Sequence, residues 1–465
     1  MKNLGRRTFL KTTLSTSISV AGLSSFSTPA FLKANESKND KIQIGCIGLG
    51  SQGSWDSNMA SQFGEIAAIC DVDINRAAAA KKRFNNDGAA ANAELYQDYR
   101  KLLDRKDIDV LIHATPDHWH TRINLDALQA GKDIYTEKPL TLTIDEGKKL
   151  CQAVKNSKCI VQTGTQQRSG TMFQTAVEIV RNKRIGNLKQ VWVTIPFYDT
   201  KGGPFSKEEV PAEMDWDVYQ GQAPLRDYNI HRTHAGFRWW YEYAGGIVTD
   251  WGNHHMDIAH WGMDCEHTGP VSVEARGLFP NQVGENYFNT PDLFFSRMNY
   301  KNGVEMFFFC AADRGQENRD NKDFYASSEK LAKLFGDDIP DGLTTYYRDG
   351  ILFIGDKGRV FVNRGGVFGR PVERLAEEPW TSSDWRAIPS DDHMKNFFEC
   401  VRTRSTPVAP VEIEHRSVSA CHLTNISIRL GGRKLQWDPD KEEFVGDPEA
   451  NAMLSREQRK PYTIG

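Results

Sequence analysis

The 465-residue sequence is poor in the features that mark several classes of protein. Its eight cysteines are sparse for the length and include no C-x-x-C pair, which excludes a disulfide scaffold and a zinc ribbon. No stretch is apolar enough to remain in a bilayer, so we expect no stable membrane span. The 58 lysines and arginines nearly balance the 61 aspartates and glutamates, and no basic block is interleaved with aromatics. We therefore expect no nucleic-acid partner.

Residues 1–34 have the order of elements typical of a targeting segment. Arg6 and Arg7 precede a mild apolar stretch that ends near Phe26, and the small residues around Ala30 allow cleavage. This arrangement resembles a twin-arginine export signal, so we expect a signal and spacer at residues 1–34 and an exported, periplasmic protein. A disordered Ser/Thr-rich leader with two chance arginines is the alternative.

The next part of the chain alternates strand-like and helical patterns. Apolar runs predict strands at residues 42–47, 66–70, 110–114 and 134–136, and helical patterns lie at 75–84, 120–130 and 144–155. Strands that alternate with helices favour a doubly wound parallel sheet, the Rossmann arrangement. We expect this domain to span residues 41–165.

Helices become rare after about residue 164, and strands follow one another. A helix is predicted at residues 173–181, and strands at 188–195, 271–276, 293–300, 304–310 and in a hairpin at 351–362. This order predicts a second α/β domain with a large, mostly antiparallel open sheet at residues 166–390. A polar insertion is expected at residues 313–349, and C-terminal helices and a tail at 391–465 are expected to pack back on the body.

A glycine loop follows the first predicted strand directly. Gly48, Gly50 and Gly53 are spaced G-x-G-x-x-G, and Asp71 closes the next strand. Such a loop lets the backbone approach a pyrophosphate, and a carboxylate at Asp71 would bind a ribose diol and repel a 2′-phosphate. The sequence therefore predicts NAD as cofactor in preference to NADP. A helix cap or turn role for Asp71 is the alternative, although Asp73 could supply it.

Polar clusters lie at the ends of three later strands, at the edge where open α/β sheets bind ligands. They occupy residues 115–120, 137–139 and 166–168. Together with the glycine loop they define the expected cofactor-binding residues: Gly48, Gly50, Ser51, Gln52, Gly53, Asp71, Thr115, Pro116, His118, His120, Glu137, Lys138 and Gln167.

Several linked motifs resemble the Gfo/Idh/MocA family of oxidoreductases. They are the glycine loop, T-P-x-x-x-H at residues 115–120, E-K-P at 137–139 and D-W-G-N-H-H-M-D at 250–257. The resemblance covers residues 41–465 and implies a substrate domain after the cofactor domain. It also implies a homo-oligomer, either a dimer or a tetramer.

The resemblance implies that Lys138, Asp250 and His254 form the reactive group. Oxidation of a carbinol needs a base for the hydroxyl proton and a cationic donor for the developing alkoxide, and His254 and Lys138 suit these roles. Asp250 and His254 are four residues apart and would share one face of a helix. The alternatives are a structural ion pair at Lys138, a capping Asp250 and a core His254.

Further polar and aromatic residues near these motifs suggest the substrate. We expect substrate contacts from Arg168, His231, His234, Arg238, Trp251 and His255. Tryptophans beside polar clusters favour a sugar-like substrate, although burial in a core is the commoner fate of tryptophan. No recognised metal-ligand spacing occurs, and no metal is expected.

Three functions fit these features. The first is an NAD-dependent oxidoreductase that acts on a sugar or sugar-derived carbinol. The second is a redox-neutral glycosidase, lyase or epimerase, which passes through a transient keto-sugar and suits an exported enzyme with a trapped cofactor. The chain lacks the T-H-G-x-G-P element of the best-known such glycosidases, since His234 is followed by Ala235 and Gly236. The third is a non-catalytic sugar-binding protein, which retention of Lys138 and His254 disfavours.

Overall fold

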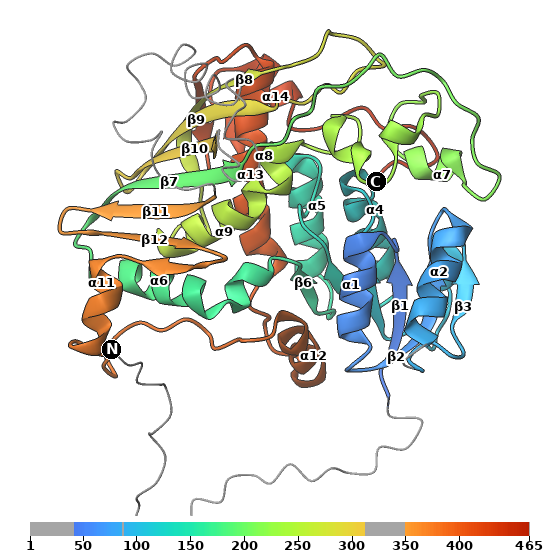
Figure 1. Cartoon of the computed structure of the whole chain (residues 1–465), viewed down its shortest axis with the longest axis horizontal. Coiled ribbons are helices and arrows are strands. Elements are labelled where there is room, and N and C mark those ends of the chain that lie inside the picture. The colour runs from blue at the N-terminus through green and yellow to red at the C-terminus, as the bar shows by residue number, and fades with distance from the viewer. Residues whose placement is uncertain (1–40, 86–87, 312–348, 465) are drawn as a thin grey trace, which may run out of the picture. The chain divides into compact units, whose positions relative to one another are not determined.

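Two β-sheets, each with its own hydrophobic cores, organise the chain (Figure 1). The computed structural model describes residues 41–85, 88–311 and 349–464. The expected leader and nearly all of the expected insertion at residues 313–349 lie outside these ranges.

The first sheet is parallel throughout and has the strand order β3-β2-β1-β4-β5-β6. Its strands are β1 (Gln43–Ile47), β2 (Glu65–Cys70), β3 (Glu94–Tyr96), β4 (Val110–His113), β5 (Asp133–Thr136) and β6 (Val161–Thr163). The helices are α1 (Ser51–Ala60), α2 (Ile74–Asn85), α3 (Tyr99–Leu103), α4 (Asp117–Gln129) and α5 (Ile144–Lys155). Alternate residues of a strand enter different cores: Ile44 and Cys46 pack with α1 and α2, whereas Ile47 packs with α3 and α4. This sheet confirms the predicted Rossmann fold.

The second sheet has nine strands in the order β13-β12-β11-β7-β10-β9-β8-β14-β15. Only β7 and β10 pair in parallel, so the prediction of a mostly antiparallel sheet is confirmed. The strands are β7 (Leu188–Pro196), β8 (Pro270–Leu278), β9 (Leu293–Tyr300), β10 (Glu305–Ala311), β11 (Gly350–Gly355), β12 (Arg359–Asn363), β13 (Gly366–Phe368), β14 (Leu435–Asp438) and β15 (Glu443–Phe444). Helices α6 (Thr171–Arg181), α9 (Gly252–Gly262) and α13 (Val411–Arg429) pack against it, and the short helix α11 (Arg370–Glu373) contacts β12.

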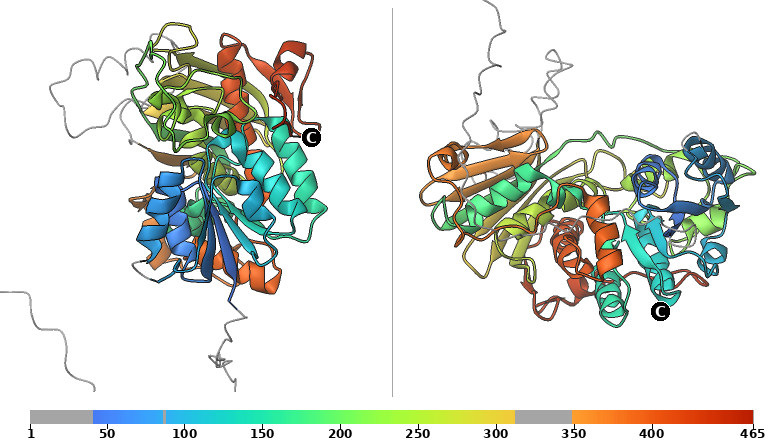
Figure 2. Two further views of the ribbon diagram at one scale, coloured as in Figure 1. Left: turned by 90° about the vertical axis from the view of Figure 1, so that its right-hand side faces the viewer. Right: turned by 90° about the horizontal axis from the view of Figure 1, so that it is seen from below.

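The C-terminal helices join the two sheets (Figure 2). Helix α12 (His393–Thr403) places Phe397 and Phe398 in a core of the Rossmann sheet. Helix α13 contributes Val418 to the Rossmann side and Ala420 and Leu423 to the core of the large sheet. This helix is therefore buried by both domains.

A long connection between β7 and the short helix α8 (Ile247–Asp250) reaches across the Rossmann domain. We call residues 197–246 the strap; it contains helix α7 (Trp216–Gln220). The strap pairs with the chain just after β2, where Asp215 N donates to Val72 O (2.9 Å) and Ile74 N donates to Glu213 O (3.1 Å). The C-terminal tail, which includes the short helix α14 (Pro448–Ala452), holds α7 in turn, because Tyr462 donates its hydroxyl to Asp217 (2.7 Å). The strap therefore covers the carboxyl edge of the parallel sheet.

The fold predicts a strict requirement for glycine at residue 53. A Cβ built on Gly53 would lie 1.8 Å from the carbonyl oxygen of Gly48, so α1 would have to move away from the loop that precedes it. We expect Gly53→Ala to lower the free energy of unfolding by about 1–3 kcal/mol, the usual cost of overpacking. Gly50→Ala is the control, because its Cβ would meet nothing nearer than 3.8 Å. Equal melting temperatures for the two variants would contradict this packing argument.

Candidate active site

A cavity of about 900 Å³ opens at the carboxyl edge of the Rossmann sheet, beneath the strap and beside α9. Most of the residues predicted from the sequence line it: Gly48, Gly50, Ser51, Gln52, Gly53, Asp71, Thr115, Pro116, Glu137, Lys138, Gln167, His234, Arg238, Asp250, Trp251 and His254. Five predicted residues do not: His118, His120, Arg168, His231 and His255. The structure thus brings the motifs of the Rossmann domain and the motif at residues 250–257 together in one cavity. The sequence could not place these two regions relative to each other.

One end of the cavity fits a dinucleotide. Gly48 has φ +80, and a Cβ there would lie 2.7 Å from Ala114 O. Only a residue without a side chain lets the loop lie this close to the residue that follows β4. Helix α1 follows with Gly50 as N-cap, no side-chain cap and no acid in its first turn. Its free N–H groups and positive dipole end are therefore available to a diphosphate.

Asp71 faces the cavity from the end of β2. Its carboxylate accepts hydrogen bonds from Leu49 N (2.7 Å) and Asp73 N (3.0 Å). Burial raises the pKa of this carboxyl to about 6. Asp73 accepts from Asn75 N (3.0 Å) at the start of α2, so both aspartates bond the backbone two residues ahead, and Asp71 also braces the glycine loop beside the cavity.

Lys138, Asp250 and Arg238 form an ion-pair cluster in the cavity. Lys138 Nζ lies 2.8 Å from Asp250 Oδ1 and donates to the backbone oxygen of Asp250 at 3.1 Å. Arg238 Nε lies 3.2 Å from the same carboxylate oxygen. Burial alone would raise the pKa of Asp250, but the charges of Lys138 and Arg238 hold it well below its usual range. Asp250 is therefore a fixed negative charge that orients Lys138.

His254 lines the cavity from the first turn of α9. Trp251 has helical dihedrals (φ -82, ψ -34) between α8 and α9, so Asp250 and His254 remain one turn apart on a nearly continuous helix. Burial, and then the charges of Lys138 and Arg364, lower the pKa of His254 well below its usual value. The imidazole is thus held in its neutral form, in which one ring nitrogen keeps a lone pair.

Glu137 is a second acidic group beside Lys138. Its Oε1 accepts hydrogen bonds from Gln166 Nε2 (2.8 Å) and Gln52 Nε2 (3.3 Å). Burial raises its pKa to about 7, although the charge of Lys138 opposes the rise. These contacts place Glu137 between the glycine loop and the lysine.

His118 and His120 are turned away from the cavity, in contrast to the sequence interpretation. Helix α4 begins at Asp117 rather than near residue 120, which rotates both side chains into the interior. His118 Nε2 lies 2.8 Å from Tyr219 O of the strap, and His120 Nδ1 lies 2.7 Å from Pro139 O. They connect the helix to the strap and to the loop after β5.

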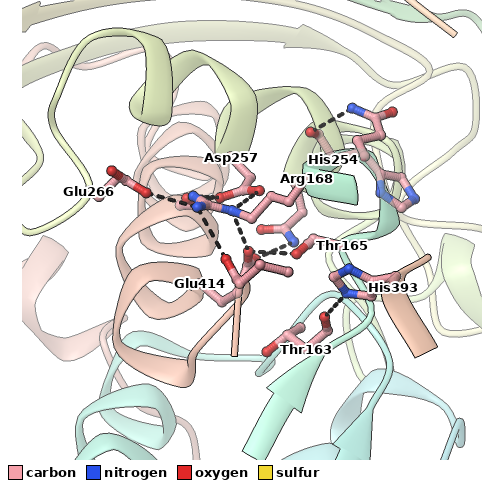
Figure 3. A network of polar contacts seen from close by, with 12 residues as sticks. Thr163, Thr165, Arg168, His254, Asp257, Glu266, His393 and Glu414 are labelled. Carbon is pink, nitrogen blue, oxygen red and sulfur yellow. Dashed lines mark hydrogen bonds and ion pairs between the residues drawn. The ribbon is translucent and has the colours of Figure 1, made fainter. Parts of the chain in front are cut away.

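Arg168 is buried in a network of carboxylates rather than exposed to substrate (Figure 3). Its guanidinium bonds both oxygens of Asp257 (2.7 and 2.6 Å) and Glu266 Oε1 (2.8 Å). Glu414 Oε1 lies 3.7 Å from Arg168 Nε and accepts a hydrogen bond from Thr165 (2.7 Å). Charge balance with acidic partners inside the protein explains why an arginine lies here.

His231 and His255, the two other histidines that we expected to contact substrate, also lie outside the cavity lining. His255 is fully buried beside Asp349 (3.5 Å) and Gln167 (3.2 Å). His231 is exposed on the strap and stacks on Phe205, with ring centroids 4.1 Å apart. Neither side chain lines the cavity in which we expected substrate contacts.

The cavity residues that were not predicted from the sequence include Arg364 and Asp117. Arg364 follows β12, places its guanidinium 4.6 Å above the ring of Trp251 and donates to Gln167 Oε1 (3.1 Å). No sequence motif marks it. Asp117 opens α4 inside a motif that was recognised, but nothing in the motif indicated that its carboxyl would face the cavity.

Within residues 41–85, 88–311 and 349–464, no group of three or more His, Cys, Asp or Glu side chains is arranged to hold a metal ion. No helix in the same ranges is long and apolar enough to cross a membrane.

Comparison with protein-family models gives two matches. The model for an oxidoreductase family with an NAD-binding Rossmann fold matches residues 42–165. The model for the C-terminal alpha/beta domain of the same oxidoreductase family matches residues 192–345 and 376–464.

Characterised relatives match only part of the chain. Inositol 2-dehydrogenase of Salmonella paratyphi B is 30% identical over 170 residues, which are 34% of this chain and 49% of that protein. Glycosyl hydrolase family 109 protein 2 of a Shewanella species is 32% identical over 163 residues, 31% of this chain and 36% of that protein. The matches thus span about half of the first relative's length and about a third of the second's.

Solved structures share the fold at low identity. A structure of myo-inositol dehydrogenase from Lactobacillus casei, in complex with NAD(H) and myo-inositol, superposes with a TM-score of 0.54 at 16% identity. The match covers 88% of this chain and 99% of that one. At this identity the similarity establishes the fold alone.

The buried network predicts that Arg168 is needed for stability. Arg168→Leu leaves Asp257 and Glu266 without their shared cation in a dry interior, and removal of one partner of a buried pair typically costs about 3–5 kcal/mol. We expect a loss of that size in the free energy of unfolding, measured by denaturant titration. A loss below about 1 kcal/mol, the range of an exposed pair, would contradict the account.

Glu414→Gln is the matched variant in the same network and should behave differently. Burial, and then the charge of Asp257, raise the pKa of Glu414 well above its usual value. The folded protein therefore keeps a proton that the unfolded chain releases above about pH 4.3. The contribution of Glu414 to the free energy of unfolding is greatest below that pH. It is lost as the pH rises toward the pKa of the folded state, by up to about 1.4 kcal/mol per pH unit. Between about pH 5 and about pH 8, the free energy of unfolding of Glu414→Gln should rise relative to that of the wild type. A difference between the two proteins that does not change with pH would contradict a protonated Glu414.

Proposed function

Because the chain belongs to the Gfo/Idh/MocA oxidoreductase family, with residues 42–165 as its NAD-binding Rossmann domain, we propose that it oxidises a carbinol of a sugar or sugar-like molecule. The observation that carries the proposal is the meeting of Lys138, Asp250 and His254 in one cavity with the glycine loop. A binding protein has no need of a neutral buried histidine beside an oriented lysine.

Each of these residues has a definite part in the proposed reaction. The neutral imidazole of His254 takes the hydroxyl proton of the substrate, and Lys138 donates a hydrogen bond to the developing alkoxide. Asp250 holds Lys138 by its 2.8 Å ion pair. The glycine loop and the start of α1 would hold the diphosphate of NAD, and Asp71 would bind a ribose diol. When bound, NAD supplies the hydride acceptor.

The cavity also accommodates a sugar beyond the reacting carbon. Arg238, Arg364 and Trp251 line it, and the two arginines are donors for hydroxyl oxygens. The partial matches to an inositol dehydrogenase and to a glycosyl hydrolase point to the same class of polyhydroxylated molecule.

A hydride-returning glycosidase, lyase or epimerase is the second candidate. The strap closes over the edge of the Rossmann sheet and is itself held by the C-terminal tail, which favours slow exchange of the cofactor. An enzyme exported by the twin-arginine route to the periplasm would need such retention, because a free nicotinamide pool is not expected there. Export and assembly as a dimer or tetramer are part of this proposal.

Lys138→Ala and His254→Ala should separate catalysis from folding. Each removes a proton-transfer group, so turnover should fall by roughly a hundredfold or more while NAD binding and melting temperature remain close to wild type. The double variant should be little worse than the poorer single variant, since both groups act on one step. Lys155→Ala, at an exposed position on α5, is the control. Full activity in both single variants would exclude this site.

The ratio of product to reduced nicotinamide decides between the two candidates. The wild type is incubated with a panel of glycosides and free sugars while product and absorbance of the reduced cofactor are recorded together. Product in excess of enzyme without net reduced cofactor supports hydride return. Reduced cofactor that accumulates one-to-one with product supports the plain dehydrogenase.

A further inference from the structure

Asp117 is a buried carboxyl of the cavity that the roles assigned above do not use. It is the first residue of α4, its residue is 5% exposed, and it lines the same cavity as Lys138, Asp250 and His254. Pro116, not Asp117, is the N-cap of the helix. As an acid in the first turn Asp117 complements the positive end of the helix dipole, and it is at the same time part of the lining of the cavity.

The surroundings of Asp117 and Asp250 shift the pKa values of the two carboxyls in opposite directions. Burial, and then the negative charge of Asp250, raise the pKa of Asp117 to about 7, although Arg238 and Lys138 oppose the rise. Asp250 is paired with Lys138 at 2.8 Å and with Arg238 at 3.2 Å, which keep its pKa low. Two carboxyls of one cavity whose pKa values are driven apart typically divide the work of a reaction between them. Asp250 is held as a charge, whereas Asp117 can exchange a proton near neutral pH.

We propose that Asp117 is a second acid–base group, which removes the proton from the carbon next to the transient carbonyl of the sugar-like substrate. The inference rests on the proposed function and deepens it, since that carbonyl comes from the oxidation described above. A plain dehydrogenase has no use for a base at this second carbon. The assignment therefore selects the hydride-returning candidate.

The step balances within the cavity. The C–H bond beside the carbonyl breaks, its proton passes to a carboxylate oxygen of Asp117, and the electron pair forms an enolate. Lys138, already placed to donate to the oxygen of the reacting carbon, stabilises the negative charge. A proton delivered to the opposite face by a second group would give the epimeric ketone. Loss of an oxygen substituent from the next carbon, with the proton of Asp117 passed to that oxygen, would give an α,β-unsaturated ketone and a free alcohol.

Exchange with solvent deuterium tests this step apart from hydride transfer. The wild type, Asp117→Asn and Asp117→Glu are mixed in D₂O with NAD and a substrate that the wild type turns over. Single-turnover absorbance reports nicotinamide reduction, and mass spectrometry and NMR report deuterium at the carbon beside the oxidised one. Asp126→Asn, at a partly exposed position on the same helix, is the matched control.

The expected result is a selective loss. Asp117→Asn should reduce nicotinamide within about threefold of the wild-type rate but lose deuterium incorporation by about a hundredfold or more, the usual worth of a general base. Asp117→Glu should recover part of the exchange, and Asp126→Asn should match the wild type in both measurements.

The contrary results are distinguishable. The role of Asp117 alone would be overturned if Asp117→Asn incorporated deuterium at the wild-type rate. It would also be overturned if the wild type reduced nicotinamide without incorporating deuterium into the substrate. Equal losses in both measurements for Asp117→Asn would also overturn it, because the carboxyl would then act on hydride transfer or folding. No nicotinamide reduction by the wild type with any sugar would overturn the proposed function itself.

Discussion

The buried pair between Arg168 and Asp257 fixes the geometry on which the site depends (Figure 3). Asp257 lies one turn after His254 on α9, so the two bonds to Arg168 set the rotation of the helix that presents the imidazole. Gln167, the neighbour of Arg168, also donates to the backbone oxygen of His254 (2.9 Å). Buried ion pairs contribute little net stability compared with an apolar core, but they strongly penalise every other arrangement. We therefore interpret the network as a device that orients α9.

The strap is the second constraint, because it encloses the cavity from the side opposite the sheet. Trp119 Nε1 donates to the backbone oxygens of Val218 and Tyr219 (both 3.0 Å), so α4 holds helix α7 of the strap from below. Arg459 of the tail pairs with Asp217 (2.7 Å) and holds the same helix from outside. Opening the cavity at this end must break contacts with two separate parts of the chain, which favours a cofactor that stays in place.

The sequence predicted the elements that carry regular patterns and missed those that depend on distant partners. Helix α5 and strand β9 have the predicted bounds, whereas β3 and β13 have only three residues each and too little periodicity to detect. The linked motifs identified the cavity because backbone spacing and polar residues define it. Arg168 was misassigned because a sequence does not reveal whether a polar side chain meets ligand or a buried acid, and Arg364 was missed because β12 reaches the cavity only through the fold.

We expect the cavity between the glycine loop and the strap to hold NAD as a resident group, with Lys138 and His254 at its reacting end. Denaturing the purified protein and quantifying the released NAD(H) by mass spectrometry tests this retention. We expect close to one nicotinamide dinucleotide per chain without added cofactor, and weaker retention once Tyr462 and Arg459 are replaced by alanine. A protein that carries none and binds none at millimolar NAD would contradict this expectation.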